Sequence, residues 1–306
     1  AQIFYYFQPD DGEKEYLLEK YNINEHNFHS ALDPNEISRL EYEENYISFI
    51  FKNPQSFIMP DKLEFRAITV GLFYFNDMML IISSEYIPIF DEKIYLHISS
   101  LFDIILHLLY QSINHFIDHL KAISMITDEL ENKISTSMEN ENLIHMFTVS
   151  KSLVYYLNAI EANSALISKI RRNVGKLGMN EDQIDILEDI IIDNNQCYRQ
   201  AEIYSSILSG LMDARGTIIN NNMNVLFKQL TIINVIFLPL NLIASVGGMS
   251  EFSMMTAGVD WRLSYMAFIL IMVLLGYVTF RFIKKLETPG IKRDKSMKRI
   301  SSLLKK

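Results

Sequence analysis

Residues 229–250, which read QLTIINVIFLPLNLIASVGGMS, contain no ionisable side chain over 22 positions. At 1.5 Å per residue a helix of this length spans about 33 Å, enough to cross a hydrocarbon layer of about 30 Å. A second uncharged stretch, residues 263–280, follows after a short segment that contains Trp261 and Arg262. The alternative is a buried hairpin in a soluble core, but two charge-free runs of this length favour a pair of membrane-spanning helices.

The C-terminal tail predicts how these helices are oriented. Residues 281–306 carry ten basic and two acidic side chains. Basic segments beside a membrane helix stay in the cytoplasm and attract anionic membrane lipids. With two spans, both termini are then expected in the cytoplasm, and we expect the bacterial inner membrane as the location. The first residues do not resemble a signal sequence, and the lone Cys197 agrees with a reducing compartment.

The charge balance limits the classes of partner. The whole chain has a formal net charge of −9 although its tail is strongly basic, so the rest of the chain is acidic. An acidic body argues against nucleic acid and is compatible with cations near its surface. We find no phosphate loop, metal-ligand cluster or nucleophile elbow, and we therefore expect neither an enzyme nor a bound cofactor other than a cation.

The N-terminal part has the composition of a mixed α/β domain. Runs of β-branched and aromatic residues predict strands, and short amphipathic stretches predict two helices. The expected strands are residues 3–7, 46–52, 64–75 and 79–84, with a hairpin turn at Asn76-Asp77, and the expected helices are residues 17–21 and 35–42.

Long helices are expected after this domain. No proline occurs between Pro88 and Pro239, and apolar residues recur at spacings of three and four. Residues 174–180 interrupt the pattern with two glycines, followed by a helix cap at Asn180. We predict helices at about residues 99–138, 142–174 and 180–249. The last would need neighbours along its length, which indicates a stalk built from several subunits.

Polar residues form a stripe along the first apolar segment. Two interleaved series with a period of seven place them on one helix face. The series are Asn224, Thr231, Leu238, Ser245 and Asn220, Phe227, Asn234, Asn241, Gly248. We call these nine residues the polar stripe. Alternating polar and apolar rings are typical of a pore wall, whereas the other interpretation is hydrogen bonding between membrane helices without a channel. A pore would need several copies of the helix around an axis, and Pro239 would permit a kink.

Three segments at the end of the stalk and along the first apolar stretch carry a family resemblance. They are residues 222–231 (NMNVLFKQLT), 237–244 (FLPLNLIA) and 248–252 (GMSEF). With these segments the chain resembles the CorA family of divalent-cation channels. The resemblance implies a homopentamer with a cytoplasmic funnel, a pore lined by the first membrane helix, and a second helix that faces lipid. It also implies passage of Mg²⁺, with Co²⁺ and Ni²⁺ as other substrates, Zn²⁺ in one relative, and divalent cations as regulatory ions.

The outer mouth departs from the family signature. Where the family has an aromatic residue and Gly-Met-Asn, this chain has Gly247 and then Gly248, Met249 and Ser250. A serine hydroxyl is shorter than a carboxamide, so the change affects contact with a hydrated ion. Glu251 beside it compensates electrostatically or is an ordinary loop carboxylate. The resemblance further places a pore-facing acidic ring at Asp213 and a regulatory ion ligand at Asp189.

These features predict an α+β membrane protein with an N-terminal cytoplasmic α/β domain, a long helical stalk and two C-terminal transmembrane helices. The expected parts are residues 1–95 (α/β domain), 96–228 (helix bundle and stalk), 229–250 (first transmembrane helix), 251–261 (external loop), 262–283 (second transmembrane helix) and 284–306 (basic tail). The expected function is a homopentameric inner-membrane channel or transporter for divalent metal cations, with Mg²⁺ as the first expectation. The alternatives are a Zn²⁺, Ni²⁺ or Co²⁺ transporter and a non-conducting membrane-anchored sensor or scaffold.

The expected pore and selectivity residues are the polar stripe together with Met249, Ser250 and Glu251. The expected ion ligands are Ser250, Asn241, Asp213 and Asp189. His115 and His119 lie four residues apart, a spacing that suits Zn²⁺, yet no third ligand with suitable spacing follows, which favours ordinary packed or exposed histidines.

Overall fold

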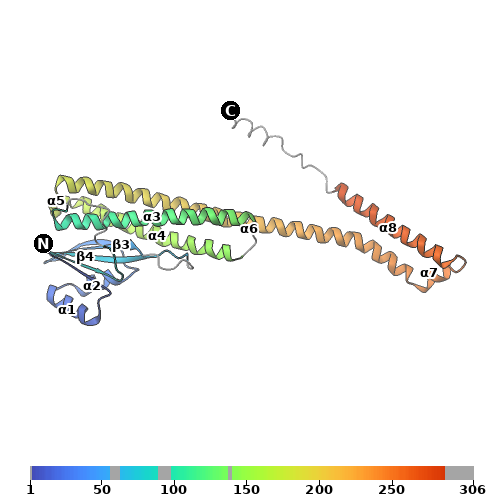
Figure 1. The fold of residues 1–306 in the computed structure, drawn as a ribbon, viewed down its shortest axis with the longest axis horizontal. Coiled ribbons are helices and arrows are strands. Elements are labelled where there is room, and N and C mark those ends of the chain that lie inside the picture. The colour runs from blue at the N-terminus through green and yellow to red at the C-terminus, as the bar shows by residue number, and fades with distance from the viewer. Residues whose placement is uncertain (1, 56–62, 89–97, 137–139, 287–306) are drawn as a thin grey trace, which may run out of the picture. The chain divides into compact units, whose positions relative to one another are not determined.

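A computed structural model of the chain describes residues 2–55, 63–88, 98–136 and 140–286 (Figure 1). The chain divides into two compact units, Ala1–Arg215 and Gly216–Lys306. The long helix α6 (Glu181–Gly247) begins in the first unit and ends in the second.

The N-terminal unit contains a five-stranded sheet with the order β1-β5-β4-β3-β2. Its strands are β1 (Gln2–Phe7), β2 (Arg39–Tyr42), β3 (Ile47–Pro54), β4 (Ala67–Tyr74) and β5 (Met78–Ser83). β1 and β5 are parallel and all other neighbours are antiparallel, including the β4–β5 hairpin that the sequence predicts. The two edge strands are therefore β1 and β2.

Both faces of the sheet are covered by helices (Figure 1). Successive residues of a strand point to opposite faces, and two apolar clusters result. On one face Ile50 and Phe73 pack with α1 (Asp11–Tyr21) and α2 (Glu25–Leu32). On the other face Phe49 and Leu72 pack with α3 (Leu101–Thr136), α4 (Asn140–Arg172) and the first part of α6. α2 lies so close to the sheet that a Cβ at Gly71 would be 2.4 Å from Cβ of Ala31, which excludes any larger residue there.

The predicted long helices are confirmed as α3, α4 and α6, and each lies within a few residues of its expected ends. The interruption between α4 and α6 holds the short helix α5 (Val174–Leu177) and ends at Gly178, whose φ of +64° favours glycine. The expected cap at Asn180 is also confirmed. Its side chain accepts from the Gln183 amide (2.8 Å), and the Gln183 side chain accepts from the Asn180 amide (3.1 Å).

Some local predictions are wrong. Residues 35–42 do not form a helix, because residues 39–42 form β2 and pair with β3, with the Glu43 amide donating to the Tyr46 carbonyl at 2.9 Å. The helix expected at 17–21 begins earlier, where Asp10 caps α1 by accepting from the Glu13 amide. α2 was not predicted. The segment expected as the external loop, residues 251–261, includes most of the short helix α7 (Ser250–Met255).

The C-terminal unit contains the last part of α6, then α7, then α8 (Trp261–Leu286). Two helices of the described residues are long and apolar enough to cross a membrane: Glu181–Gly247 within its apolar part, and Trp261–Ile283. No residue of their most apolar windows is buried by the rest of the chain. The observed architecture is the expected α+β class with two C-terminal apolar helices. The exact borders of the six parts stay a prediction, and most of the basic tail lies outside the described residues.

Candidate functional site

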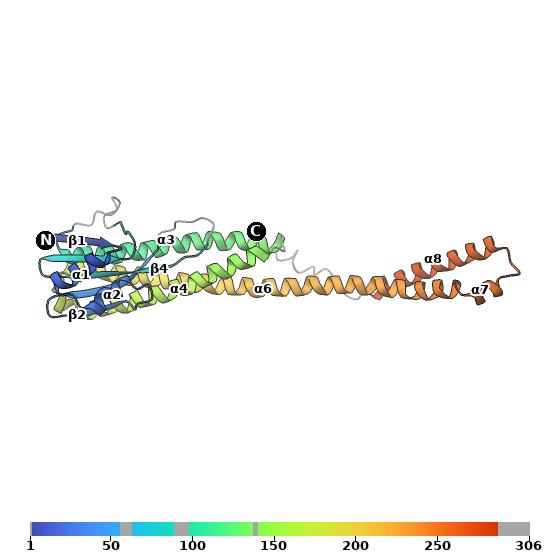
Figure 2. The ribbon, with the colours of Figure 1, turned by 90° about the horizontal axis from the view of Figure 1, so that it is seen from below.

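The end of α6 packs against α8 within the C-terminal unit (Figure 2). A Cβ at Gly247 would be 2.6 Å from Cζ of Phe268, and a Cβ at Gly276 would be 3.7 Å from Cδ1 of Leu240. Earlier residues of α6 thus contact later residues of α8, so the two helices are antiparallel neighbours. The contact between Gly247 and Phe268 was not predicted. The glycine in place of an aromatic residue was the available signal, but the sequence alone does not identify its partner.

The polar stripe lies on the face of α6 that does not contact α8. Between residues 229 and 247, the α6 residues that the chain partly covers share one side of the helix. They are Ile232, Ile236, Pro239, Leu240, Ile243 and Gly247. All nine residues of the polar stripe are exposed. At 100° per residue the centres of the two sets are about 170° apart around the helix axis. A single chain therefore covers one face of α6 with its own α8 and leaves the striped face open.

The stripe combines amide, hydroxyl and apolar surfaces. Thr231 donates its hydroxyl to the Phe227 carbonyl at 2.8 Å, so its hydrogen is used within the helix and its oxygen remains an acceptor. Leu238 is 70% exposed and Phe227 is 57% exposed, so both apolar side chains project fully from the chain. Hydrogen-bonding groups and apolar side chains thus alternate along the exposed face.

The signature segment follows directly on the end of α6. The Gly248 amide donates to the carbonyls of Ala244 (3.1 Å) and Ser245 (3.2 Å), and the Met249 amide donates to that of Val246 (3.1 Å). A Cβ at Gly248 would be 3.5 Å from the Ser245 carbonyl oxygen, which is an ordinary contact. Room for a methyl group therefore exists inside one chain, and any crowding there must come from other copies. Ser250 is exposed, and the side chain of Glu251 is outside the described residues.

The four predicted ion ligands do not come together within one chain. Asp189 and Asp213 are both exposed on α6, and 24 positions of helix separate them by about 36 Å. Asn241 lies in the last part of α6, whereas Ser250 lies beyond the end of α6, at the start of α7. Within the described residues, no three His, Cys, Asp or Glu side chains gather at one point. These four residues therefore do not form a common ion site within one chain.

His115 and His119 form a packed polar cluster in the N-terminal unit. Their ring centroids are 5.0 Å apart, and Nδ1 of His119 is 2.6 Å from the hydroxyl oxygen of the buried Tyr156. Burial lowers the pKa of both histidines, to about 4 for His119, whose pKa is lowered further by His115. One ring nitrogen of His119 is thus already engaged, and the described residues supply no third ligand. This arrangement agrees with packed histidines rather than a zinc site.

Comparison with known proteins identifies the family. The family model described as "CorA-like Mg2+ transporter protein" matches residues 2–285. The cobalt/magnesium transport protein CorA of Methanocaldococcus jannaschii is 25% identical over 80% of this chain and 78% of its own length. The protein of the same name from Thermotoga maritima is 27% identical over 58% of this chain and 51% of its own length.

A solved structure supports the fold. The complete CorA magnesium transporter from Methanocaldococcus jannaschii superposes with a TM-score of 0.75 at 20% sequence identity, covering 92% of this chain and 89% of that one. Members of this family move ions across membranes and are not enzymes. With a match over nearly its whole length, the chain belongs to the family of CorA-like Mg²⁺ transporter proteins.

Proposed function

We propose that this chain forms a homopentameric channel or transporter for divalent cations in the bacterial inner membrane, with Mg²⁺ as its main ion. Its pore is the space enclosed by the polar stripes of five α6 helices, and both termini are cytoplasmic. The observation that carries the proposal is the position of the stripe: it is exposed and lies on the face of α6 away from α8.

The stripe requires partners outside the chain. Asparagine side chains within a membrane segment are costly unless they face water or other polar groups. Because α8 covers the opposite face, copies of α6 around an axis would satisfy the stripe, while α8 faces lipid. Detergent-solubilised protein should therefore form five copies of the 35.6 kDa chain, about 180 kDa plus detergent in mass photometry. A uniform monomer or dimer would remove the basis for a pore.

The chemistry of the stripe suits a hydrated cation. Mg²⁺ releases its water reluctantly, and the amide oxygens of Asn224, Asn234 and Asn241 accept hydrogen bonds from that water. Rings of Phe227 and Leu238 would form dry constrictions. Gly248 to Glu251 would form the outer mouth, and Asp213 and Asp189 remain candidates for a pore-facing ring and a regulatory ion site.

Ion uptake into proteoliposomes tests this function. Wild-type protein should admit Mg²⁺, measured with an enclosed fluorescent dye, and Asn241→Leu should reduce the rate about tenfold because five amide oxygens are lost. Ile233→Leu, an apolar change off the stripe, is the matched control. A pentamer that admits none of Mg²⁺, Co²⁺, Ni²⁺ and Zn²⁺ would instead support the non-conducting sensor or scaffold.

A second candidate is a transporter selective for Zn²⁺, Ni²⁺ or Co²⁺, and Ser250 is the observation that favours it. Five hydroxyls in place of five carboxamides change the contacts at the mouth, and each contact is worth about 0.5–1.5 kcal/mol. Ser250→Asn should shift the uptake ratio of Mg²⁺ to Zn²⁺ towards Mg²⁺. Glu251→Gln should lower uptake mainly at low salt, where an exposed carboxylate is least screened. If neither variant changes ion preference or rate, the mouth is not the filter.

A further inference from the structure

A hollow of about 530 Å³ opens in the N-terminal unit, apart from the proposed pore. It lies between the loop from α2 to β2, the adjacent parts of β3 and β4, and α4. Its volume falls within the usual range for small-molecule sites. Lys52 of β3 and Glu36 contribute to its lining, with Arg66, Ile37, Tyr155 and Ala162 around them.

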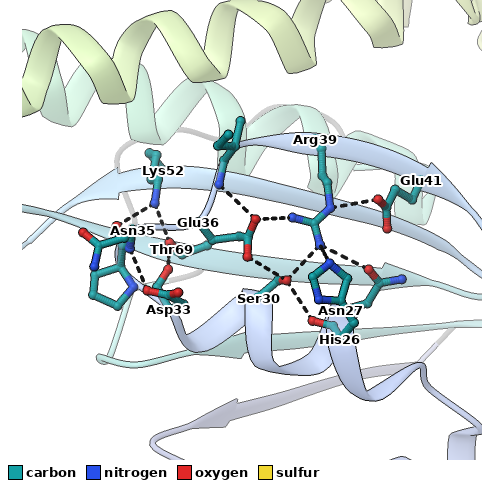
Figure 3. Close-up of polar contacts among 12 residues, drawn as sticks. His26, Asn27, Ser30, Asp33, Asn35, Glu36, Arg39, Glu41, Lys52 and Thr69 are labelled. Carbon is teal, nitrogen blue, oxygen red and sulfur yellow. Dashed lines mark hydrogen bonds and ion pairs between the residues drawn. The ribbon is translucent and has the colours of Figure 1, made fainter.

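Lys52 is a buried cation without a close counter-ion. The residue is 6% exposed, and its ammonium donates to the Pro34 carbonyl (2.7 Å) and the Thr69 hydroxyl oxygen (2.8 Å) (Figure 3). Both acceptors are neutral, and an ammonium has three donors. Within the described part of the chain, no ion pair involves Lys52. A buried charge without an ionic partner is costly, so this ammonium would gain from an anion.

The nearest carboxylates are committed to other groups. Glu36 accepts from Arg39 Nη1 (2.6 Å) and from the Ser30 hydroxyl (3.0 Å), and Asp33 accepts from the Asn35 amide (2.9 Å) (Figure 3). Burial lowers the pKa of Lys52 to about 8, although Asp33 and Glu36 act in the opposite direction. Lys52 is therefore mostly charged at neutral pH, and these two carboxylates only partly offset its desolvation.

The backbone of Lys52 is held in place independently of its ammonium. β2 ends its pairing with β3 at Ile50, and the side chain of Asn163 on α4 takes over two residues later. Its Oδ1 accepts from the Lys52 amide (2.8 Å), and its Nδ2 donates to the Lys52 carbonyl (2.8 Å). The cation is thus preorganised, which reduces the cost of binding a ligand.

We propose that this hollow binds a small organic anion whose carboxylate or phosphate group pairs with the Lys52 ammonium. Arg66, which forms an ion pair with Glu64 at 2.9 Å, adds a second positive group at the exposed rim. Ile37 and Ala162 offer apolar surface to the rest of the ligand, because the hollow is much larger than a single anionic group. This site belongs to the cytoplasmic body and does not depend on the pore.

Anion-dependent thermal stability of the detergent-solubilised full chain tests the site, with chloride keeping the ionic strength constant. Sodium acetate and inorganic phosphate, titrated separately, distinguish carboxylate from phosphate recognition. Wild type should show a saturable rise in melting temperature with at least one of them. Lys52→Met should weaken the apparent affinity roughly ten- to a hundredfold, the worth of a hydrogen bond to a charged group. Lys121→Met, which removes an exposed lysine of α3, should bind like wild type.

Two further arms separate binding from a purely structural role of Lys52. Ala162→Leu fills the hollow without touching the ammonium and should also weaken the response, which keeps the test open if Lys52→Met does not fold. The acetate response should be weaker at pH 9 than at pH 7, because Lys52 loses its proton in between while acetate keeps its charge. A response that is absent in wild type, or equal in wild type, Lys52→Met and Ala162→Leu, would overturn the proposal.

Discussion

The two halves of α6 show the same secondary structure in two different environments. Between Glu181 and Arg215 the helix buries a stripe with a spacing of three, four and seven against its own chain. The buried residues are Gln183, Leu187, Ile190, Asn194, Cys197, Ala201, Leu208 and Arg215. From Gly216 to Gly247 none of the described residues of the helix is buried. The first half is buried by its own chain, whereas the second half is only partly covered, on the side that faces α8.

The asparagines of the two halves of α6 differ in their surroundings. Asn194 is 3% exposed and donates to the Ile160 carbonyl of α4 at 3.4 Å, so its partner lies within the chain. Asn234 and Asn241 are exposed on the face of α6 that α8 leaves open. A buried polar group is matched by a specific partner, whereas a striped exposed face in a membrane segment calls for water, an ion or another copy. The same residue type thus has a structural role in one half and the proposed transport role in the other.

The largest difference in the free energy of unfolding is expected between two leucine-to-alanine substitutions, one in each unit. Leu120 of α3 is fully buried, whereas Leu270 of α8 is 64% exposed. Leu120→Ala should reduce the free energy of unfolding by about 2–5 kcal/mol because it leaves a cavity. Leu270→Ala should change it by less than about 0.5 kcal/mol. Thermal and urea unfolding of the full chain in detergent would measure both. Equal losses would mean that the C-terminal unit has a core of its own.

A smaller but more specific effect is expected from glycines on α6. Gly247→Ala places a Cβ within 2.6–2.8 Å of the Phe268 ring, so α6 and α8 must shift at the proposed mouth. Overpacking of this kind costs about 1–3 kcal/mol, and Mg²⁺ uptake should fall about tenfold or more. Phe268→Ala in the same chain should restore uptake. Gly210→Ala, at a position with nothing within 4 Å, is the control. Failure of Phe268→Ala to rescue would separate transport from this contact.

Substitution of an apolar residue of the polar stripe should change Mg²⁺ flux a few-fold. Leu238→Ala widens a proposed dry constriction and should raise Mg²⁺ flux roughly three- to tenfold. Ile233→Ala, which removes an exposed apolar side chain off the stripe, should leave flux unchanged. Proteoliposome uptake at matched protein density would compare them. If both variants behave like wild type, the constriction is elsewhere.

Much of the fold is predictable because its signals are local. Absence of proline, a cap at Asn180 and absence of charge between residues 229 and 250 each report on a few neighbouring residues. β2 escaped prediction because Arg39–Tyr42 has no strand composition of its own and is a strand only through its pairing with β3. Its register is a property of two segments together, which residue patterns along one segment do not reveal.

The same distinction applies to the candidate sites. Helical periodicity identified the polar stripe, since all its members belong to one helix. The contact between Gly247 and Phe268 depends on how two helices align, and the burial of Lys52 depends on Pro34 and Thr69 from two other segments. A lysine in a strand reads as an exposed residue until those acceptors are known. A candidate site within one element could therefore be proposed from the sequence, whereas contacts between elements could not.

The smallest expected effect is on the loss of folding stability at acidic pH. His119 has a pKa lowered from 6.5 to about 4 by burial and by His115, while Asp118 acts in the opposite direction and Tyr156 faces it from α4. The unfolded chain therefore binds this proton more readily than the folded one. Stability from neutral His119 is present above about pH 6.5 and is lost as the pH falls towards 4.

His119→Asn should therefore flatten the pH dependence of the free energy of unfolding between pH 6.5 and 4, by the order of 1 kcal/mol. The melting temperature, recorded across this pH range, would show the change. His29→Asn replaces an exposed histidine and should leave the slope as in wild type. All seven histidines of the chain belong to the N-terminal unit, so acid sensitivity that comes from histidine belongs to that unit. An unchanged slope in His119→Asn would show that water reaches the His119 ring in solution, and that the N-terminal unit is less tightly closed around α3 and α4 than its burial indicates.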